Sequence, residues 1–74
     1  MPERAGWVAT GDPVTDIGIV REAAGELYRL EGVELWIRAE NPMLDGERPY
    51  RLVQKGETQR VLDLILALCE GVIF

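Results

Sequence analysis

The segment WIRAENPMLDGERPYRLVQKGETQRVLDLILALCEGVIF, which runs from Trp36 to Phe74, decides the fold of this 74-residue chain. Its most apolar part, residues 61–69, is apolar on almost every side of a helix. A helix of this kind lies at the centre of its domain or turns a second face to another chain. The sequence then closes with GVIF at residues 71–74, an unusually apolar terminus for a small domain. We therefore expect a partner.

Proline and glycine divide residues 33–56 into short elements. A helix is expected over residues 33–40, and it should stop ahead of Pro42, because the residue before a proline avoids the helical region. Residues 41–48 form a loop in this interpretation. Residues 49–55 form a further short helix that begins with a proline and ends at a glycine.

The residues before this segment predict one more amphipathic helix. Asp12 is a favourable N-cap, with Thr15 as a competing one. Apolar residues three and four positions apart predict about four turns, with Gly32 as the stop. Those apolar residues are Ile17, Val20, Ala24, Leu27 and Leu30. Residues 1–12 show no helical period and are expected to form an extended or disordered arm, which leaves residues 13–74 as the helical domain.

The sequence thus predicts an all-α fold, a small compact bundle of about four helices with a loose N-terminal arm. A chain of 74 residues buries only about 60% of its unfolded surface, so its core is marginal. One cysteine cannot build a disulfide framework. Additional stability would come from self-association or from a partner.

The composition argues against an enzyme, and we predict no catalytic residue, no cofactor and no metal site. The chain has no histidine and no serine, and Cys69 lies on an apolar helix face, where a thiol is usually inert. Glu22 and Glu26 are one helical turn apart without further ligands, which is typical of a solvated face. No glycine-rich phosphate loop is present.

The charge argues against nucleic-acid binding by this chain alone. The net charge is −5, and the eight Lys and Arg residues are spaced out rather than clustered, as phosphate binding would require. No apolar run reaches the ~18 residues of a membrane span, and no secretory signal is visible. We therefore expect a cytoplasmic protein, which also suits a lone reduced thiol.

An ordered set of motifs resembles the toxin-binding C-terminal domain of the Xre/MbcA/ParS antitoxins. The resemblance covers about residues 22–74, and its specificity lies in the order and spacing of the motifs. The motifs are Trp36-Ile37-Arg38, Asn41-Pro42, Leu44-Asp45-Gly46-Glu47-Arg48-Pro49-Tyr50-Arg51-Leu52-Val53, Gly56, Val61-Leu62, Leu66 and Gly71-Val72.

The resemblance implies a compact helical unit that binds a RES-domain toxin, an enzyme that destroys NAD in the cytosol. It implies that the C-terminal tip lies at or near the toxin's active-site entrance and blocks it. The implied scaffold residues are Trp36, Leu52, Leu62 and Leu66. The implied partner-binding residues are Asn41, Arg48, Tyr50, Arg51, Gly71, Val72, Ile73 and Phe74.

Two features depart from the family pattern. Antitoxins of this kind usually carry an N-terminal helix-turn-helix segment, whereas only about 20 residues precede the matching region, which argues against DNA contact. The family usually has Thr or Ser before the proline of the third helix, but Arg48 offers only donors and cannot cap a helix N-terminus.

Alternatives to toxin binding stay open at this point. The chain could be a self-associating homodimeric module that pairs through its last helix and has no toxin partner. Arg48 and Arg51 could be ordinary surface charges. Phe74 could pack against its own domain.

Overall fold

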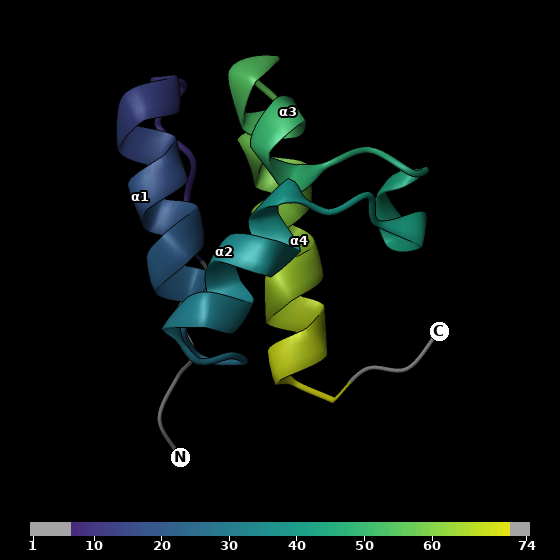
Figure 1. The fold of residues 1–74 in the computed structure, drawn as a ribbon. Coiled ribbons are helices and arrows are strands. Elements are labelled where there is room, and N and C mark those ends of the chain that lie inside the picture. The colour runs from purple at the N-terminus through teal and green to yellow at the C-terminus, as the bar shows by residue number, and fades with distance from the viewer. Residues whose placement is uncertain (1–6, 72–74) are drawn as a thin grey trace.

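The computed structural model describes residues 7–71, which contain helices and no strand (Figure 1). The all-α fold expected from the sequence is confirmed. The elements are α1 (Pro13–Ala24), α2 (Leu30–Arg38), the 3-10 helix η1 (Pro42–Leu44), α3 (Pro49–Gln54) and α4 (Thr58–Cys69).

The helix α4 is the central element of the fold. It packs against α1, α3 and η1, and α2 packs against α1 and α3 on the outside of the bundle (Figure 1). Four α4 residues reach the core: Val61, Leu62, Leu64 and Ile65. Residues 66–69 of the same helix are half-buried. The apolar excess of α4 is therefore used largely within its own domain.

The start of α1 agrees with the first of the two predicted caps. Asp12 is the N-cap, and its carboxylate accepts hydrogen bonds from the Thr15 amide at 3.3 Å and the Thr15 hydroxyl at 2.7 Å. These bonds stabilise the charged carboxylate and lower the pKa of Asp12. Thr15 is a donor to the cap and not the cap itself.

The predicted end of this first helix is wrong. The helix stops at Ala24, and a turn of the chain leads to α2, which begins at Leu30 instead of Val33. Gly32 does not end a helix but lies inside α2, where a Cβ atom would come within 3.1 Å of the Tyr28 Cβ. The glycine therefore permits close contact between α2 and the turn that precedes it.

A buried carboxylate ties residues 10 and 11 to α1. Asp16 is 1% exposed. It accepts hydrogen bonds from the Thr10 hydroxyl at 2.6 Å, the Thr10 amide at 2.8 Å and the Gly11 amide at 3.1 Å. The bond from the Thr10 hydroxyl does most to lower the pKa of Asp16, against the opposing effect of burial. The Thr58 hydroxyl also lowers this pKa, although its oxygen makes no hydrogen bond of ordinary geometry.

A second contact holds the preceding residues against α4. The side-chain amide of Gln59 donates to the Trp7 carbonyl at 3.1 Å, and its carbonyl accepts from the Ala9 amide at 3.0 Å. Trp7 and Ala9 also pack against the apolar core. Residues 7–11 therefore have defined contacts with two helices.

We predict that Asp16 makes the stability of the domain depend on pH. Folding lowers the pKa of Asp16 below its ordinary value of 3.8. The contribution of Asp16 to the free energy of unfolding is therefore complete when the pH is above 3.8, and it is lost as the pH falls through the lowered pKa. Asp16→Asn should lower the free energy of unfolding at pH 7. The difference from the wild type should shrink as the pH falls below about 4. Urea unfolding followed by circular dichroism measures both effects.

Asp45→Asn is the control for loss of one carboxylate, because the Asp45 side chain is 90% exposed. The Asp45→Asn variant should change the free energy of unfolding little, both at pH 7 and at about pH 2.5. A difference between Asp16→Asn and the wild type that stays constant from pH 7 to about pH 2.5 would contradict the assignment.

Candidate partner-binding surface

The loop that contains η1 is organised by Asn41. The Asn41 side chain accepts a hydrogen bond from the Met43 amide at 2.9 Å and thereby caps η1. Its backbone carbonyl accepts from the Leu44 and Gly46 amides, both at 2.9 Å, and its amide donates to the Glu47 carbonyl at 3.1 Å. The half-buried Asn41 is thus a structural residue of the loop, and its side-chain oxygen is already engaged.

The tip of this loop is the turn predicted from Asp45-Gly46. Both residues have positive φ, 59° and 81° respectively, which asparagine, aspartate and glycine tolerate best. Leu44 is 3% exposed and anchors the turn in the core, whereas Met43 is 51% exposed.

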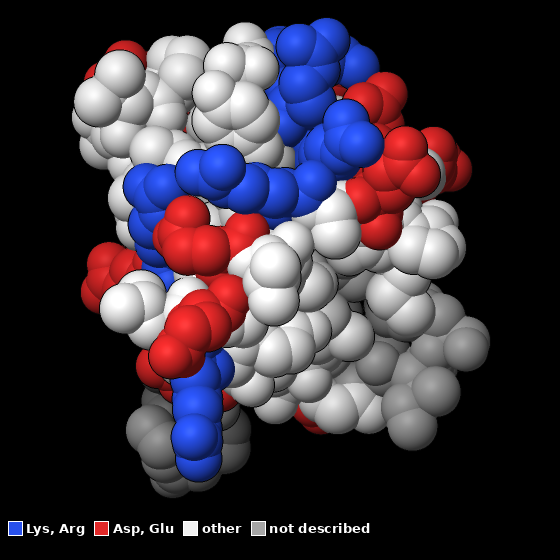
Figure 2. Space-filling model, in the orientation of Figure 1, with Lys and Arg blue, Asp and Glu red and all other residues white. Residues whose placement is uncertain are grey.

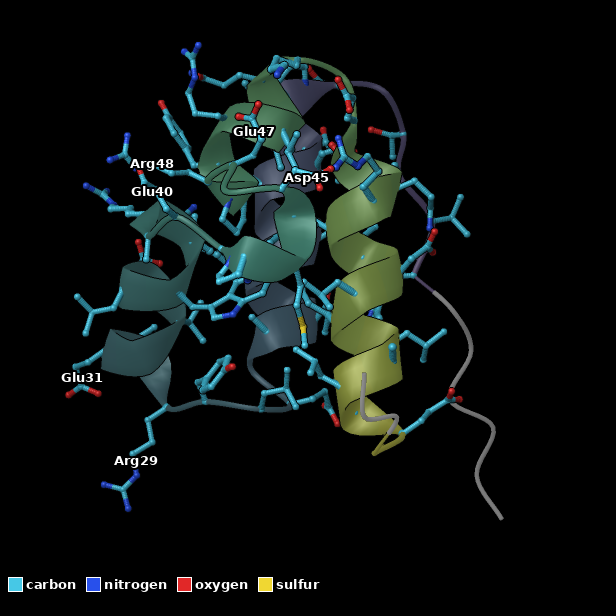
Figure 3. All side chains as sticks on the ribbon, turned by 90° about the vertical axis from the view of Figure 1, so that its right-hand side faces the viewer. Arg29, Glu31, Glu40, Asp45, Glu47 and Arg48 are labelled. Atoms are coloured by element: carbon cyan, nitrogen blue, oxygen red, sulfur yellow. The ribbon has the colours of Figure 1, made fainter. Side chains whose placement is uncertain are left out.

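Two ion pairs connect the loop to the neighbouring helices. Arg60 of α4 lies 3.2 Å from Asp45, and Lys55 lies 3.1 Å from Glu47. Figure 3 labels both carboxylates of the loop. Exposed pairs of this kind contribute little energy each, but together with the buried Leu44 they hold the loop in one arrangement.

The start of α3 presents two exposed arginines. Arg48 precedes Pro49 without a side-chain capping bond, as its donor-only chemistry predicts. Its guanidinium lies 3.7 Å from the Glu40 carboxylate in an exposed pair, and the two side chains lie side by side in Figure 3. Arg51 is exposed on the next turn. Within residues 7–71, Arg51 forms no ion pair within 4 Å, and the pair of Arg48 is long and exposed.

Tyr50 separates two surface hollows. It is 44% exposed, and its hydroxyl accepts a hydrogen bond from the Gln54 amide at 3.0 Å. One hollow, of about 180 Å³, is mostly apolar and lies between α1 and α3. The other, of about 170 Å³, lies between Tyr50 and Arg38. The apolar hollow is lined by Pro13, Val14, Ile17, Tyr50, Val53 and Gln54.

This part of the surface is cationic although the chain is acidic overall. Figure 2 shows Lys and Arg side chains in a band across one face, with Asp and Glu at its edges. Arg38, which the sequence-based prediction of the site did not include, lines the hollow beside Tyr50. An aromatic ring, an apolar hollow and adjacent guanidinium groups suit a partner with an apolar side chain next to a carboxylate.

The last predicted segment is at the other end of α4. Gly71 is exposed, has a φ of 77°, and donates its amide hydrogen bond to the Leu68 carbonyl at 3.1 Å, which ends the helix. The 12 residues of α4 span about 18 Å, so Gly71 lies one helix length from α3 (Figure 1). The other predicted residues of the tip, Val72, Ile73 and Phe74, lie outside the described residues.

Two carboxylates of the described chain are held in ion pairs with arginines. Glu34 and Glu57 have lowered pKa values, caused mainly by hydrogen bonds from Arg21 and Arg60, each at 2.7 Å. Both carboxylates are thus held in the charged form, unlike a general acid, whose pKa must be raised. Between residues 7 and 71, no three His, Cys, Asp or Glu side chains gather as metal ligands. No helix in this range is long and apolar enough to cross a membrane.

Residues 7–71 form a small all-α domain with a preformed loop. Comparison with known proteins identifies relatives of this domain. The chain is similar to the mycobacterial cidal antitoxin MbcA of Mycobacterium bovis and of two strains of Mycobacterium tuberculosis. In each case 37% of 57 residues are identical, which covers 77% of this chain and 50% of the relative. The resemblance expected from the motifs is confirmed, and the chain carries an MbcA-like antitoxin domain.

The chain therefore spans half the length of the curated relatives that it matches. No profile of a protein family and no solved structure matches it.

We predict that Asn41 acts on the loop and not directly on a partner. Asn41→Ala removes the acceptor for the Met43 amide and should lower the free energy of unfolding by about 1 kcal/mol, the usual cost of a lost cap. Asn41→Asp keeps an acceptor oxygen and should unfold at nearly the same urea concentration as the wild type. Equal destabilisation by the two variants, measured by urea unfolding, would contradict this role.

Proposed function

We propose that this chain is the toxin-binding part of an antitoxin and neutralises a RES-domain toxin that degrades NAD. In this proposal, the C-terminal tip covers the toxin's active-site entrance. The observation that carries the antitoxin assignment is the 37% identity to MbcA over 77% of the chain. The RES-domain partner and the covering mechanism follow from the motif resemblance described above. Inhibition by covering a site requires no chemistry from the inhibitor, only an exposed surface of matching shape and charge.

The loop and α3 supply suitable anchor residues for such an interface. Tyrosine and arginine are enriched among residues that dominate binding energy, and Tyr50, Arg48 and Arg51 are exposed together on a rigid support. The support is rigid because the loop is closed by the Asn41 hydrogen bonds and anchored by Leu44. A preformed surface loses less conformational entropy on binding than a flexible one.

The size of the molecule favours a partner that uses both ends of α4. A standard interface buries about 800 Å² on each partner, whereas the whole accessible surface is 4899 Å². The toxin would then contact a large share of one side, reaching from Arg48 and Tyr50 to the segment after Gly71. The positive φ of Gly71 supports this role for the tip, because it ends α4 and lets the chain leave the helix axis.

We predict that removal of residues 72–74 abolishes inhibition of the toxin. The assay is NAD hydrolysis by a purified RES-domain toxin, with the full chain or the shortened chain added. The shortened chain should remain helical by circular dichroism, because it keeps every described helix and the core cluster between Val20 and Ile65. A chain in which residues 72–74 are replaced by Gly-Ser-Gly is the control that keeps the length and removes the apolar side chains.

Each outcome of this assay has one meaning. Loss of inhibition in both variants supports an apolar tip that fills the entrance. Full inhibition by the shortened chain overturns the covering mechanism but leaves binding intact. If the intact chain neither binds the RES-domain protein nor inhibits it, the proposed partner class is wrong.

We predict further that Arg48 and Arg51 contribute to the affinity for the toxin. The double variant Arg48→Ala/Arg51→Ala should bind about 10- to 100-fold more weakly, and its affinity should depend less on salt concentration. Arg29→Ala is the matched control, because Arg29 is an exposed arginine at the opposite end of α2 from this surface (Figure 3). Calorimetric titrations at two salt concentrations measure the difference. A loss of binding free energy in the double variant no larger than twice that of Arg29→Ala would mean that only net charge matters.

A further inference from the structure

The outer face of α2 exposes two leucines. Leu30 is 75% exposed and Leu35 is 72% exposed, the largest exposures of any leucine in the described chain. Together with Glu31, Glu34 and Arg38 they line a shallow, mostly apolar groove. We define these five residues as the α2 face.

The α2 face is not needed to hold α2 in place. The opposite side of the helix supplies Val33 and Ile37 to the core, which are 3% and 1% exposed, and the half-buried Trp36 packs beside them. The helix α2 lies on the outside of the bundle (Figure 1), and Glu31 points away from the other helices (Figure 3). An apolar groove of this kind with charged edges is typical of an interaction surface.

The charges on the α2 face have opposite signs at its two ends. Glu31 is in the first turn of α2 and Arg38 is in the last turn. Within residues 7–71, neither side chain takes part in an ion pair within 4 Å, whereas Glu34 is already paired with Arg21 at 2.7 Å. A surface with an acid near one end, a base at the other and an exposed leucine between them can pair with a copy of itself.

We propose that the α2 face is a homodimer interface in which two copies of α2 pack antiparallel about a two-fold axis. With the axis between Glu34 and Leu35, Glu31 lies opposite Arg38 of the partner subunit, because the two positions are equally far from the axis. Three to four residues per turn place Leu30 and Leu35 on opposite flanks of the helix face. The two-fold rotation keeps each flank on its own side, so it sets Leu35, which lies next to the axis, beside Leu35 of the partner subunit.

The charge pattern selects this orientation. A parallel pair of helices would set Glu31 against Glu31 of the partner subunit and Arg38 against Arg38 of the partner subunit, which is repulsive. The antiparallel pair converts both repulsions into attractions. This interface also differs from the dimer through the last helix that the sequence left open, because the inner residues of α4 are buried in their own domain.

The α2 face is small, so the dimer is expected to be weak. It covers less than the roughly 800 Å² per partner of a standard interface, which suggests dissociation in the micromolar range or above. The proposal does not depend on toxin binding. It concerns the free chain and would stand if the toxin assignment failed.

The test is sedimentation of the full chain over a concentration series from about 10 µM to about 1 mM. The wild type should shift from monomer to dimer. Leu35→Glu should stay monomeric over the series, because it buries an unpaired charge beside the leucines. Val8→Glu is the matched control, since Val8 is also 72% exposed but lies outside the α2 face, and it should dimerise as the wild type does.

A charge-exchange cycle tests the geometry. Glu31→Arg and Arg38→Glu should each weaken the dimer by about 10-fold or more, because each sets like charges face to face. The double variant Glu31→Arg/Arg38→Glu restores opposite charges and should recover dimerisation to within a few-fold of the wild type. Circular dichroism confirms that each variant remains helical.

Several results would overturn the proposal. They are a wild type that is monomeric at every concentration, a dimer that Leu35→Glu leaves intact, and a double variant no better than its single variants. Loss of dimerisation in Val8→Glu to the same extent as in Leu35→Glu would also refute it, because added charge alone would then explain the effect.

Discussion

Everything in this fold depends on covering one helix that is too apolar to face water. The helix α4 places Val61, Leu62, Leu64 and Ile65 in the core, and a chain of 74 residues has few elements to surround it. The solution is to use three neighbours, α1, α3 and the short η1, on different sides of α4. Because these three elements are committed to α4, α2 is left on the outside of the bundle and the η1 loop is held beside α3.

Capping residues, prolines and glycines in the sequence predicted most of this fold, and the main error was the boundary between α1 and α2. The cap at Asp12, the turn at Asp45-Gly46 and the proline start of α3 depend on backbone chemistry that a sequence displays directly. The boundary between α1 and α2 was misplaced because the prediction put the stop at Gly32, whereas the first helix already ends at Ala24 with Gly25 as its C-cap. Gly32 lies inside the second helix, where the absence of a Cβ atom leaves room for Tyr28, four residues earlier.

The candidate site was predicted less completely than the fold. The structure places Tyr50, Arg48 and Arg51 together on one support, but it assigns Asn41 to the interior bonding of the loop. Arg38 was part of the quoted motif, yet only the folded chain brings it next to Tyr50. The exposed Leu35 could have been noticed, because it falls off the stripe of Val33, Trp36 and Ile37. Arg38 and Tyr50 are far apart in the sequence, and the spacing of residues along the chain does not reveal that they line the same hollow.

The contact between Gln59 and the residues before α1 has one further consequence. A glutamine amide presents a donor nitrogen and an acceptor oxygen at a fixed separation, as a neighbouring β-strand would, and here they meet the Trp7 carbonyl and the Ala9 amide. Sliding this segment by a single residue would break both bonds and withdraw Trp7 from the core. One side chain on α4 therefore sets the register of a segment that has no regular secondary structure.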